Sequence, residues 1–131
     1  MFTIHSVDSE KELVFSSYQG EQFQVDLKGY EVSAMVNVWN GGKCYSSSLP
    51  HFFKNLAFHK KPWSGSKEWG SLDGELKISA TCTTLGQVAF AVELRQAVGG
   101  PEEWLVKASI VTELGQLEKI AQDARTFFLK K

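Results

Sequence analysis

Short stretches in which apolar and polar residues alternate recur along this chain, and turn residues separate them. The clearest stretches cover residues 22–28, 75–82 and 87–95. A period of two is typical of β-strands that bury one face. Where such stretches lie close in sequence, the turns between them are too short for the crossovers that parallel strands need, so the pattern predicts antiparallel pairing between those neighbours.

Four weaker stretches extend the same pattern. Residues 2–7 and 12–18 are rich in β-branched and aromatic residues and predict a first hairpin. Residues 30–38 follow Gly29 and predict a partner for the strand at 22–28. Residues 104–110 predict the last strand of a three-stranded meander. Glycine pairs at 41–42 and 99–100 mark further turns.

Two other segments have the spacing of amphipathic helices. Ser48 precedes Pro50, an order that is typical of a helix start. The apolar residues that follow fall on one helical face: Leu49, Phe52, Phe53 and Leu56. This helix is expected to end before Pro62, and residues 60–71 then form an irregular loop. Residues 113–129 predict a second helix with a stripe of Leu117, Ile120, Ala121, Ala124 and Phe128.

These segments predict one α+β domain over residues 1–131. Its largely antiparallel sheet has about six to seven strands, in the order four strands, a helix, three strands and a helix. Both helices are expected to pack mainly on one face of the sheet. The other face is then partly open and carries a broad mixed-charge set of outward residues: Glu75, Lys77, Ser79, Thr81, Gln87, Glu93, Arg95, Lys107 and Ser109.

Composition narrows the environment and the partners. No apolar run approaches the roughly 20 residues of a membrane-spanning helix, and the first twelve residues do not have the pattern of a signal peptide. We therefore expect a cytoplasmic protein that makes no membrane contact. Cys44 and Cys82 are expected to be reduced, buried thiols. The net charge of −1 disfavours nucleic acid as a partner.

The sequence does not have the spacings that catalysis or metal binding usually require. It contains no Gly-x-Ser-x-Gly elbow, no Cys-x-x-Cys pair and no phosphate-binding glycine loop. His51 and His59 on one helix would be separated by a rise of about 12 Å, which is too far to share a metal ion. We expect no cofactor, and the sequence favours a non-enzymatic role.

Aromatic and cationic residues interleave in the loop at 60–71, where Trp63 and Trp69 accompany three lysines. Such a loop can anchor a partner, because tryptophan is enriched in binding hot spots. It can also fold back onto the core, since large aromatic residues usually bury most of their area. We expect burial for Trp69, and we expect Trp63 to reach solvent because it follows Pro62.

The same loop carries a family resemblance. Trp63, Gly65, Trp69, Ser71 and Leu72, followed by an alternating strand, resemble a family of small bacterial proteins that is known only as a domain of unknown function. The similarity covers roughly the C-terminal two thirds of the chain. It implies the fold of that family and a bacterial origin, and the family has no known activity to transfer.

The favoured function is a small protein-binding domain with an immunity-like or regulatory role, since the layout also resembles that of small toxin-neutralising immunity proteins. The candidate binding residues are Trp63, Lys67, Trp69, His51, His59, Lys77 and Arg95. The alternative is a small-ligand or enzyme cleft between the sheet and the first helix, lined by Phe52 and both loop tryptophans, with His51 or His59 as its polar group. A homodimer is also possible if the N-terminal strand or the strand ending at Thr112 is a free edge.

Overall fold

Two antiparallel sheets of four strands each, together with two α-helices, make up the part of the chain that the structure describes, residues 1–40, 48–96 and 101–129. In this computed structural model the first sheet contains β1 (Phe2–His5), β2 (Glu12–Ser16), β3 (Gln22–Lys28) and β4 (Ser33–Trp39). The second sheet contains β5 (Lys67–Gly70), β6 (Leu76–Cys82), β7 (Gln87–Arg95) and β8 (Leu105–Glu113). The helices are α1 (Ser48–Ala57) and α2 (Leu117–Leu129), and a 3-10 turn, η1 (Leu114–Gln116), leads into α2.

The predicted α+β class and the antiparallel pairing are confirmed, but the single sheet of six to seven strands is wrong. The strand order in each sheet is the order in the sequence, and α1 stands between the two sheets. Each strand pairs only with its sequence neighbours, so the strands on either side of α1 form separate ladders. The predicted order of four strands, a helix, three strands and a helix is also wrong, because it omits β5.

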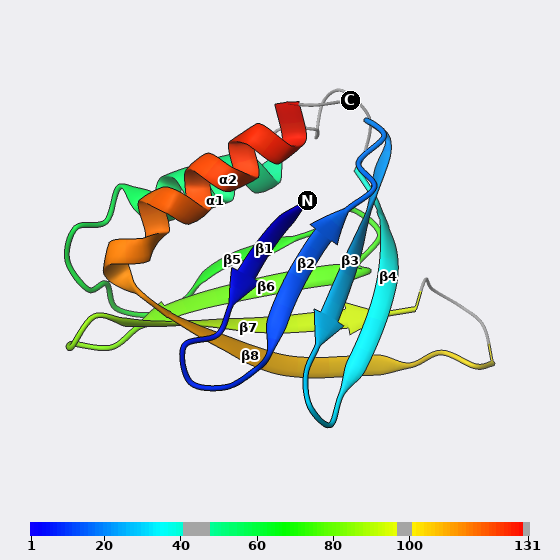
Figure 1. Ribbon diagram of the computed structural model, residues 1–131, viewed down its shortest axis with the longest axis horizontal. Helices are drawn as coiled ribbons and strands as arrows, with labels where there is room; N and C mark the ends of the chain where they lie inside the picture. The colour runs from blue at the N-terminus through cyan, green and yellow to red at the C-terminus, as the bar shows by residue number, and fades with distance from the viewer. Residues whose placement is uncertain (41–47, 97–100, 130–131) are drawn as a thin grey trace.

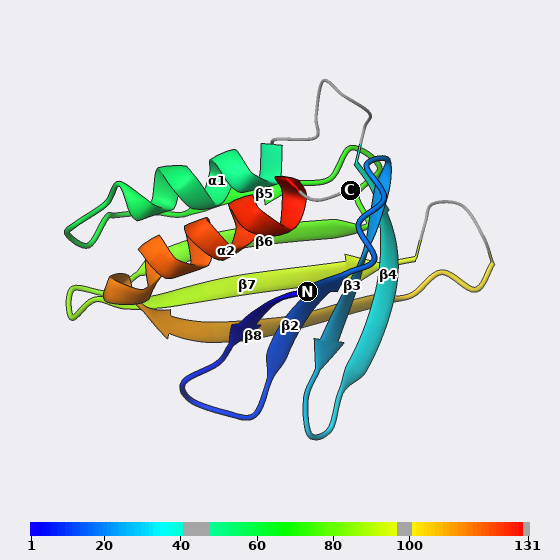
Figure 2. The same cartoon turned by 45° about the horizontal axis from the view of Figure 1, so that its top comes forward.

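The first sheet crosses over the second, and the two helices lie side by side next to the second sheet (Figures 1 and 2). The sheets meet where β1 approaches β8. There Val7 N donates to Val111 O at 2.8 Å, and Val111 N donates to Ser6 Oγ at 3.2 Å. Each sheet has its apolar face turned toward the other elements, which leaves the opposite face in solvent.

One apolar core joins all of these layers. On β3 the inward side chains Phe23, Val25 and Leu27 are at most 1% exposed. Phe53 of α1 links the layers, since its ring contacts Phe2 at 5.8 Å and Phe90 at 6.1 Å between ring centroids. Edge-to-face contacts of this kind add to the stabilisation that burial provides.

Several local predictions need correction. The strand predicted from residue 30 begins at Ser33, because Gly29 N donates to Val32 O and closes a turn around Tyr30, which is 90% exposed. Glu75, expected on the outer face, is buried at 5% exposure by hydrogen bonds described below. Cys82 is a free thiol that is half-buried.

A few sequence predictions fall on residues whose structure is not described. These are the glycine turns at 41–42 and 99–100 and the thiol of Cys44, which lie outside the described residues.

Candidate functional site

β4 lies at one edge of the first sheet and pairs with β3 along one side only. Two hydrogen bonds at its ends fix the pattern of this pairing: Gly29 N donates to Val32 O at 2.8 Å, and Asn40 N donates to Glu21 O at 2.6 Å. Antiparallel neighbours alternate between bonded and unbonded pairs, so alternate β4 residues turn their backbone N–H and C=O groups away from β3. These residues are Ser33, Met35, Asn37 and Trp39.

A buried carboxylate satisfies the last of these outward groups. Trp39 N donates to Oε2 of Glu75 at 3.1 Å, and the Ser71 hydroxyl donates to Oε1 of the same carboxylate at 2.7 Å. Within residues 1–40, 48–96 and 101–129, Met35 N and Asn37 N have no protein acceptor. The middle of the β4 edge is therefore open, while its end is closed by Glu75.

Apolar side chains lie beside the open edge. Met35 is 46% exposed and Trp39 is 43% exposed, and both project from the outer face of β4. Leu72, which is 56% exposed, lines a hollow of about 70 Å³ together with Trp39. Methionine and tryptophan are enriched in the central parts of protein interfaces. We call Met35, Asn37, Trp39 and Leu72, with the β4 backbone between them, the β4 edge surface.

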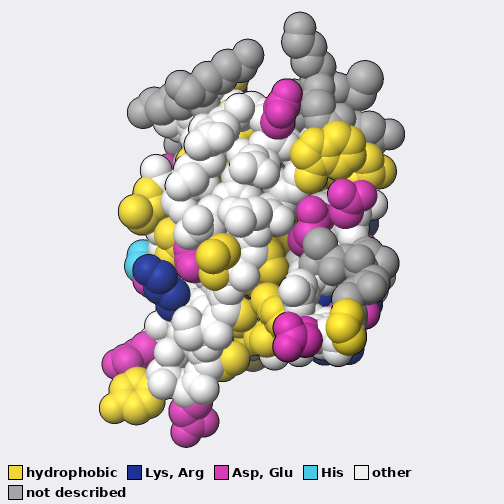
Figure 3. Space-filling view, turned by 90° about the vertical axis from the view of Figure 1, so that its right-hand side faces the viewer, with side chains coloured by type: hydrophobic (Ala, Val, Ile, Leu, Met, Phe, Trp, Pro, Cys, Tyr) yellow, Lys and Arg dark blue, Asp and Glu magenta, His cyan; other side chains and the backbone are white. Residues whose placement is uncertain are grey.

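Charge around the β4 edge surface is predominantly acidic. Asp26 lies directly opposite Met35 on β3, Glu31 stands in the β3–β4 turn, and Glu21 pairs with Asn40. Lys28, opposite Ser33, is the one basic residue of β3, β4 and their turn. Figure 3 faces this side of the molecule and shows acidic side chains spread over it, with Lys and Arg side chains near its margins.

The other three sheet edges are protected in ways that β4 is not. The edge of β1 lies beside α2, and the chain just beyond it bonds to β8. β5 is only four residues long and lies beside α1. β8 contains the exposed Lys107, and a lysine on an edge strand discourages pairing with another strand. By contrast, β4 has seven residues and contains neither a charged residue nor proline.

The tryptophans of the loop at 60–71 lie at opposite ends of α1. Trp63 is 9% exposed, its indole N–H donates to Ala80 O at 3.3 Å, and its ring lies 5.0 Å from that of His59. Trp69 is half-buried on β5 and donates to the Ser48 hydroxyl at 3.2 Å. The prediction that Trp63 is the one that reaches solvent is wrong, because the hydrogen bond to Ala80 holds its ring against the second sheet.

The remaining predicted site residues do not form one cluster. His51 is exposed on α1, and Lys67 is exposed on β5. Lys77 is exposed on the outer face of the second sheet, directly opposite Glu93. Arg95 forms an ion pair with Glu103 at 2.9 Å.

The cleft predicted beside α1 is divided between two separate hollows. The apolar face of α1 is buried against the core along its length. Trp69 lines the hollow at the start of the helix together with Ser48, whereas His59 lines a second hollow of about 170 Å³ beyond the end of the helix. Residues expected to share one ligand, Trp69 and His59, therefore line different hollows. A ligand or enzyme site beside α1 stays a prediction.

A larger hollow of about 440 Å³ lies between β1 and α2. Phe2, Tyr18 and Phe127 form its aromatic side, and Asp123 and Thr126 form its polar side. The Asp123 carboxylate already forms an ion pair with Lys119 at 2.8 Å.

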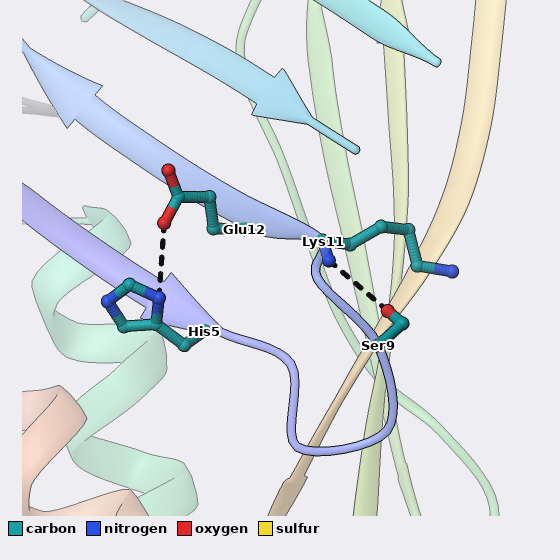
Figure 4. A network of polar contacts seen from close by, with 4 residues as sticks. All are labelled: His5, Ser9, Lys11 and Glu12. Carbon is teal, nitrogen blue, oxygen red and sulfur yellow. Dashed lines mark hydrogen bonds and ion pairs between the residues drawn. The ribbon is translucent and has the colours of Figure 1, made fainter. Parts of the chain in front are cut away.

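The polar contacts at the first hairpin do not form a catalytic arrangement. His5 Nδ1 lies 3.1 Å from Glu12 Oε2, while the Ser9 hydroxyl accepts a hydrogen bond from Lys11 N at 3.2 Å (Figure 4). Ser9 is thus bonded to the turn rather than to the histidine that would have to activate it.

Among the described residues, no group of three or more His, Cys, Asp or Glu side chains is arranged to hold a metal ion. The described residues also contain no helix that is long and apolar enough to cross a membrane.

Comparison with known protein families identifies a match. The model of a family of unknown function, DUF6228, matches residues 4–131 of the chain. No curated protein and no solved structure matches it. The predicted membership of a family of unknown function is confirmed, and the match extends beyond the C-terminal two thirds to nearly the whole chain.

Proposed function

The chain belongs to DUF6228, a family of unknown function, and we propose that it is a non-enzymatic protein-binding domain whose contact site is the β4 edge surface. A partner would add a strand of its own to β4. Strand addition provides affinity through main-chain hydrogen bonds, and side chains beside the edge provide specificity. Immunity-like and regulatory roles both depend on binding one protein partner, and both fall within this proposal.

One observation carries the proposal: the outward backbone groups of Met35 and Asn37 have no protein partner in the described part of the chain. Sheet proteins usually protect long edges with lysine, proline, bulges or covering elements. Among the described residues, the other three edges have such protection and β4 does not. The exposed side chains of Met35 and Trp39 add apolar area next to the open backbone.

The experiment compares two proline variants in co-purification with a tagged chain from its native host. Asn37→Pro removes an outward N–H of β4 and leaves the hydrogen bonds to β3 in place, since proline is tolerated where the N–H faces solvent. Ser109→Pro makes the same change at the free side of β8, where Ser109 also turns its N–H outward. The proposal expects a stoichiometric partner that the wild type and Ser109→Pro retain and Asn37→Pro loses.

Two results would overturn the proposal. The first is a partner that Asn37→Pro retains at the wild-type level. The second is the absence of any stoichiometric protein partner of the wild type under several lysis conditions. Met35→Lys serves as a second variant if Asn37→Pro fails to fold, because a lysine on the edge opposes pairing without changing the backbone.

A further inference from the structure

We infer that the strand added to β4 is an extended segment of another protein that carries basic residues. This inference rests on the proposed function, since it specifies the occupant of the same β4 edge surface. It depends on the charges around the edge and not on the open backbone alone.

The charges next to β4 are mainly negative. Asp26 lies next to Met35 on the outer face, Glu31 flanks the start of β4, and Glu21 flanks its end. Glu75 adds a buried carboxylate at Trp39 N. Lys28 is the single basic residue of β3, β4 and their turn, and it lies between Glu12 of β2 and Ser33 of β4. Two cations from other elements lie nearby: Lys11 lies against Gly29 of the turn, and Arg95, which forms an ion pair with Glu103, is the cross-strand neighbour of Glu75. A strand beside β4 would thus meet more negative than positive charge along its length.

β4 itself contributes no charge, so the flanking carboxylates set the electrostatic preference. Opposite charges next to a pairing edge favour association, and like charges oppose it. A second copy of this chain would bring the same acidic surface against itself. An extended segment with lysine or arginine avoids this repulsion, and its backbone can bond to Met35 and Asn37 as any strand can.

The edge also limits the length and shape of this segment. The open part of β4 extends from Ser33 to Asn37. At the next outward residue, Trp39, the backbone N–H already donates to the Glu75 carboxylate. The added strand is therefore short, and its side chains on the outer face would lie beside Met35 and Asn37. An apolar residue there can contact Met35, and basic residues two positions before or after it, which share the outer face, can approach Asp26 and Glu31.

The test measures binding of three fluorescein-labelled nine-residue peptides by fluorescence anisotropy. The peptides alternate valine with lysine, with glutamate or with glutamine, so they share strand propensity and differ in charge. We expect the lysine peptide to bind roughly 3- to 10-fold more tightly than the glutamate peptide at low salt, the range that a few exposed charge pairs provide. This preference is expected to shrink as salt is raised, because screening shortens the reach of exposed charges.

Two matched variants locate the effect on the edge. Met35→Lys and Met35→Glu place opposite charges at the same exposed position, and both leave the inward face of β4 unchanged. We expect Met35→Lys to weaken binding of the lysine peptide and Met35→Glu to preserve or strengthen it. Asn37→Pro is expected to abolish binding, while Ser109→Pro does not change it.

The outcomes separate this inference from the proposed function. Equal binding of all three peptides, or tighter binding of the glutamate peptide, with loss of binding in Asn37→Pro would overturn the basic partner and leave strand addition at β4 standing. No binding of any peptide, or binding that Asn37→Pro leaves unchanged, would overturn both. Sedimentation that shows a wild-type dimer, which Asn37→Pro converts to monomer, would assign the edge to a second copy and also overturn the basic partner.

Discussion

Replacement of Trp63 by alanine tests the packing of α1 against the second sheet. The side chain is 9% exposed, and its indole N–H donates to Ala80 O. A buried aromatic side chain removes about 200 Å² from water, which corresponds to about 5 kcal/mol at about 25 cal/mol per Å². Compactness of the unfolded chain lowers this value by about a quarter. Loss of the hydrogen bond adds about 1 kcal/mol. We therefore expect Trp63→Ala to lower the free energy of unfolding by about 5 kcal/mol.

The matched control is Trp69→Ala. Trp69 is half-buried, and its indole N–H bonds to the Ser48 hydroxyl at the other end of α1. About half of the apolar loss applies there, about 2 kcal/mol, and loss of the hydrogen bond adds about 1 kcal/mol, so we expect about 3 kcal/mol. A second control, Trp63→Phe, keeps most of the ring area and removes the donor, for which we expect about 1–2 kcal/mol.

Urea unfolding followed by far-UV circular dichroism measures these differences without relying on tryptophan fluorescence. With an m-value of about 1.5 kcal/mol/M, a loss of about 5 kcal/mol lowers the midpoint by about 3.3 M. The reasoning would be refuted if Trp63→Ala stayed within about 1 kcal/mol of the wild type, or if Trp69→Ala were the more destabilising of the two.

Two further predictions concern an ion pair and a turn. Lys60 donates a hydrogen bond to Glu118 and also attracts it by charge, which lowers the pKa of Glu118. In an NMR titration, Lys60→Ala is expected to raise that pKa toward its ordinary value. An unchanged pKa would contradict the pairing. The stabilisation from this pair is present above the unfolded-state pKa of Glu118 and is lost as pH falls through the folded-state pKa. Gly86 has φ +88°, and the one atom close to an added Cβ is Leu114 Cβ at 3.8 Å, so Gly86→Ala is expected to cost about 1–2 kcal/mol through backbone strain. Gly115→Ala, whose added Cβ meets no atom within 4 Å, is expected to change stability by no more than about 0.5 kcal/mol. Thermal denaturation compares the two variants, and equal melting temperatures would refute this prediction.

The alternating pattern predicted most strands and the buried side of each, because a strand that buries one face requires apolar residues at alternate positions. Phe23, Val25 and Leu27 show this on β3. The pattern could not show that the chain divides into two sheets at α1, since each strand alternates in the same way whichever sheet it joins. β5 was missed because Lys67, Glu68 and Gly70 do not alternate with apolar residues, and only the ladder to β6 makes this segment a strand.

The candidate site was predicted less well than the fold. The residues chosen from the sequence were aromatic, basic and imidazole side chains, whereas the open edge of β4 consists of backbone groups whose lack of a partner depends on strand order. One signal was present in the sequence. The run from Ser33 to Trp39 is uncharged and contains no proline, so it does not have the protection that edge strands usually carry. The roles of Trp63 and Trp69 were exchanged, because the carbonyl of Ala80 that orients Trp63 becomes its neighbour only in the folded sheet.

Sequential strand order has a consequence for how this chain folds. Every pairing in both ladders joins neighbours in the sequence, so each can close as a hairpin within microseconds. The two halves of the chain are then connected mainly by side chains, and Phe53 of α1 contacts rings from both halves through Phe2 and Phe90. Closing these distant contacts costs more chain entropy than closing a hairpin. We therefore expect the packing of Phe53, rather than the formation of any strand pair, to limit the folding rate.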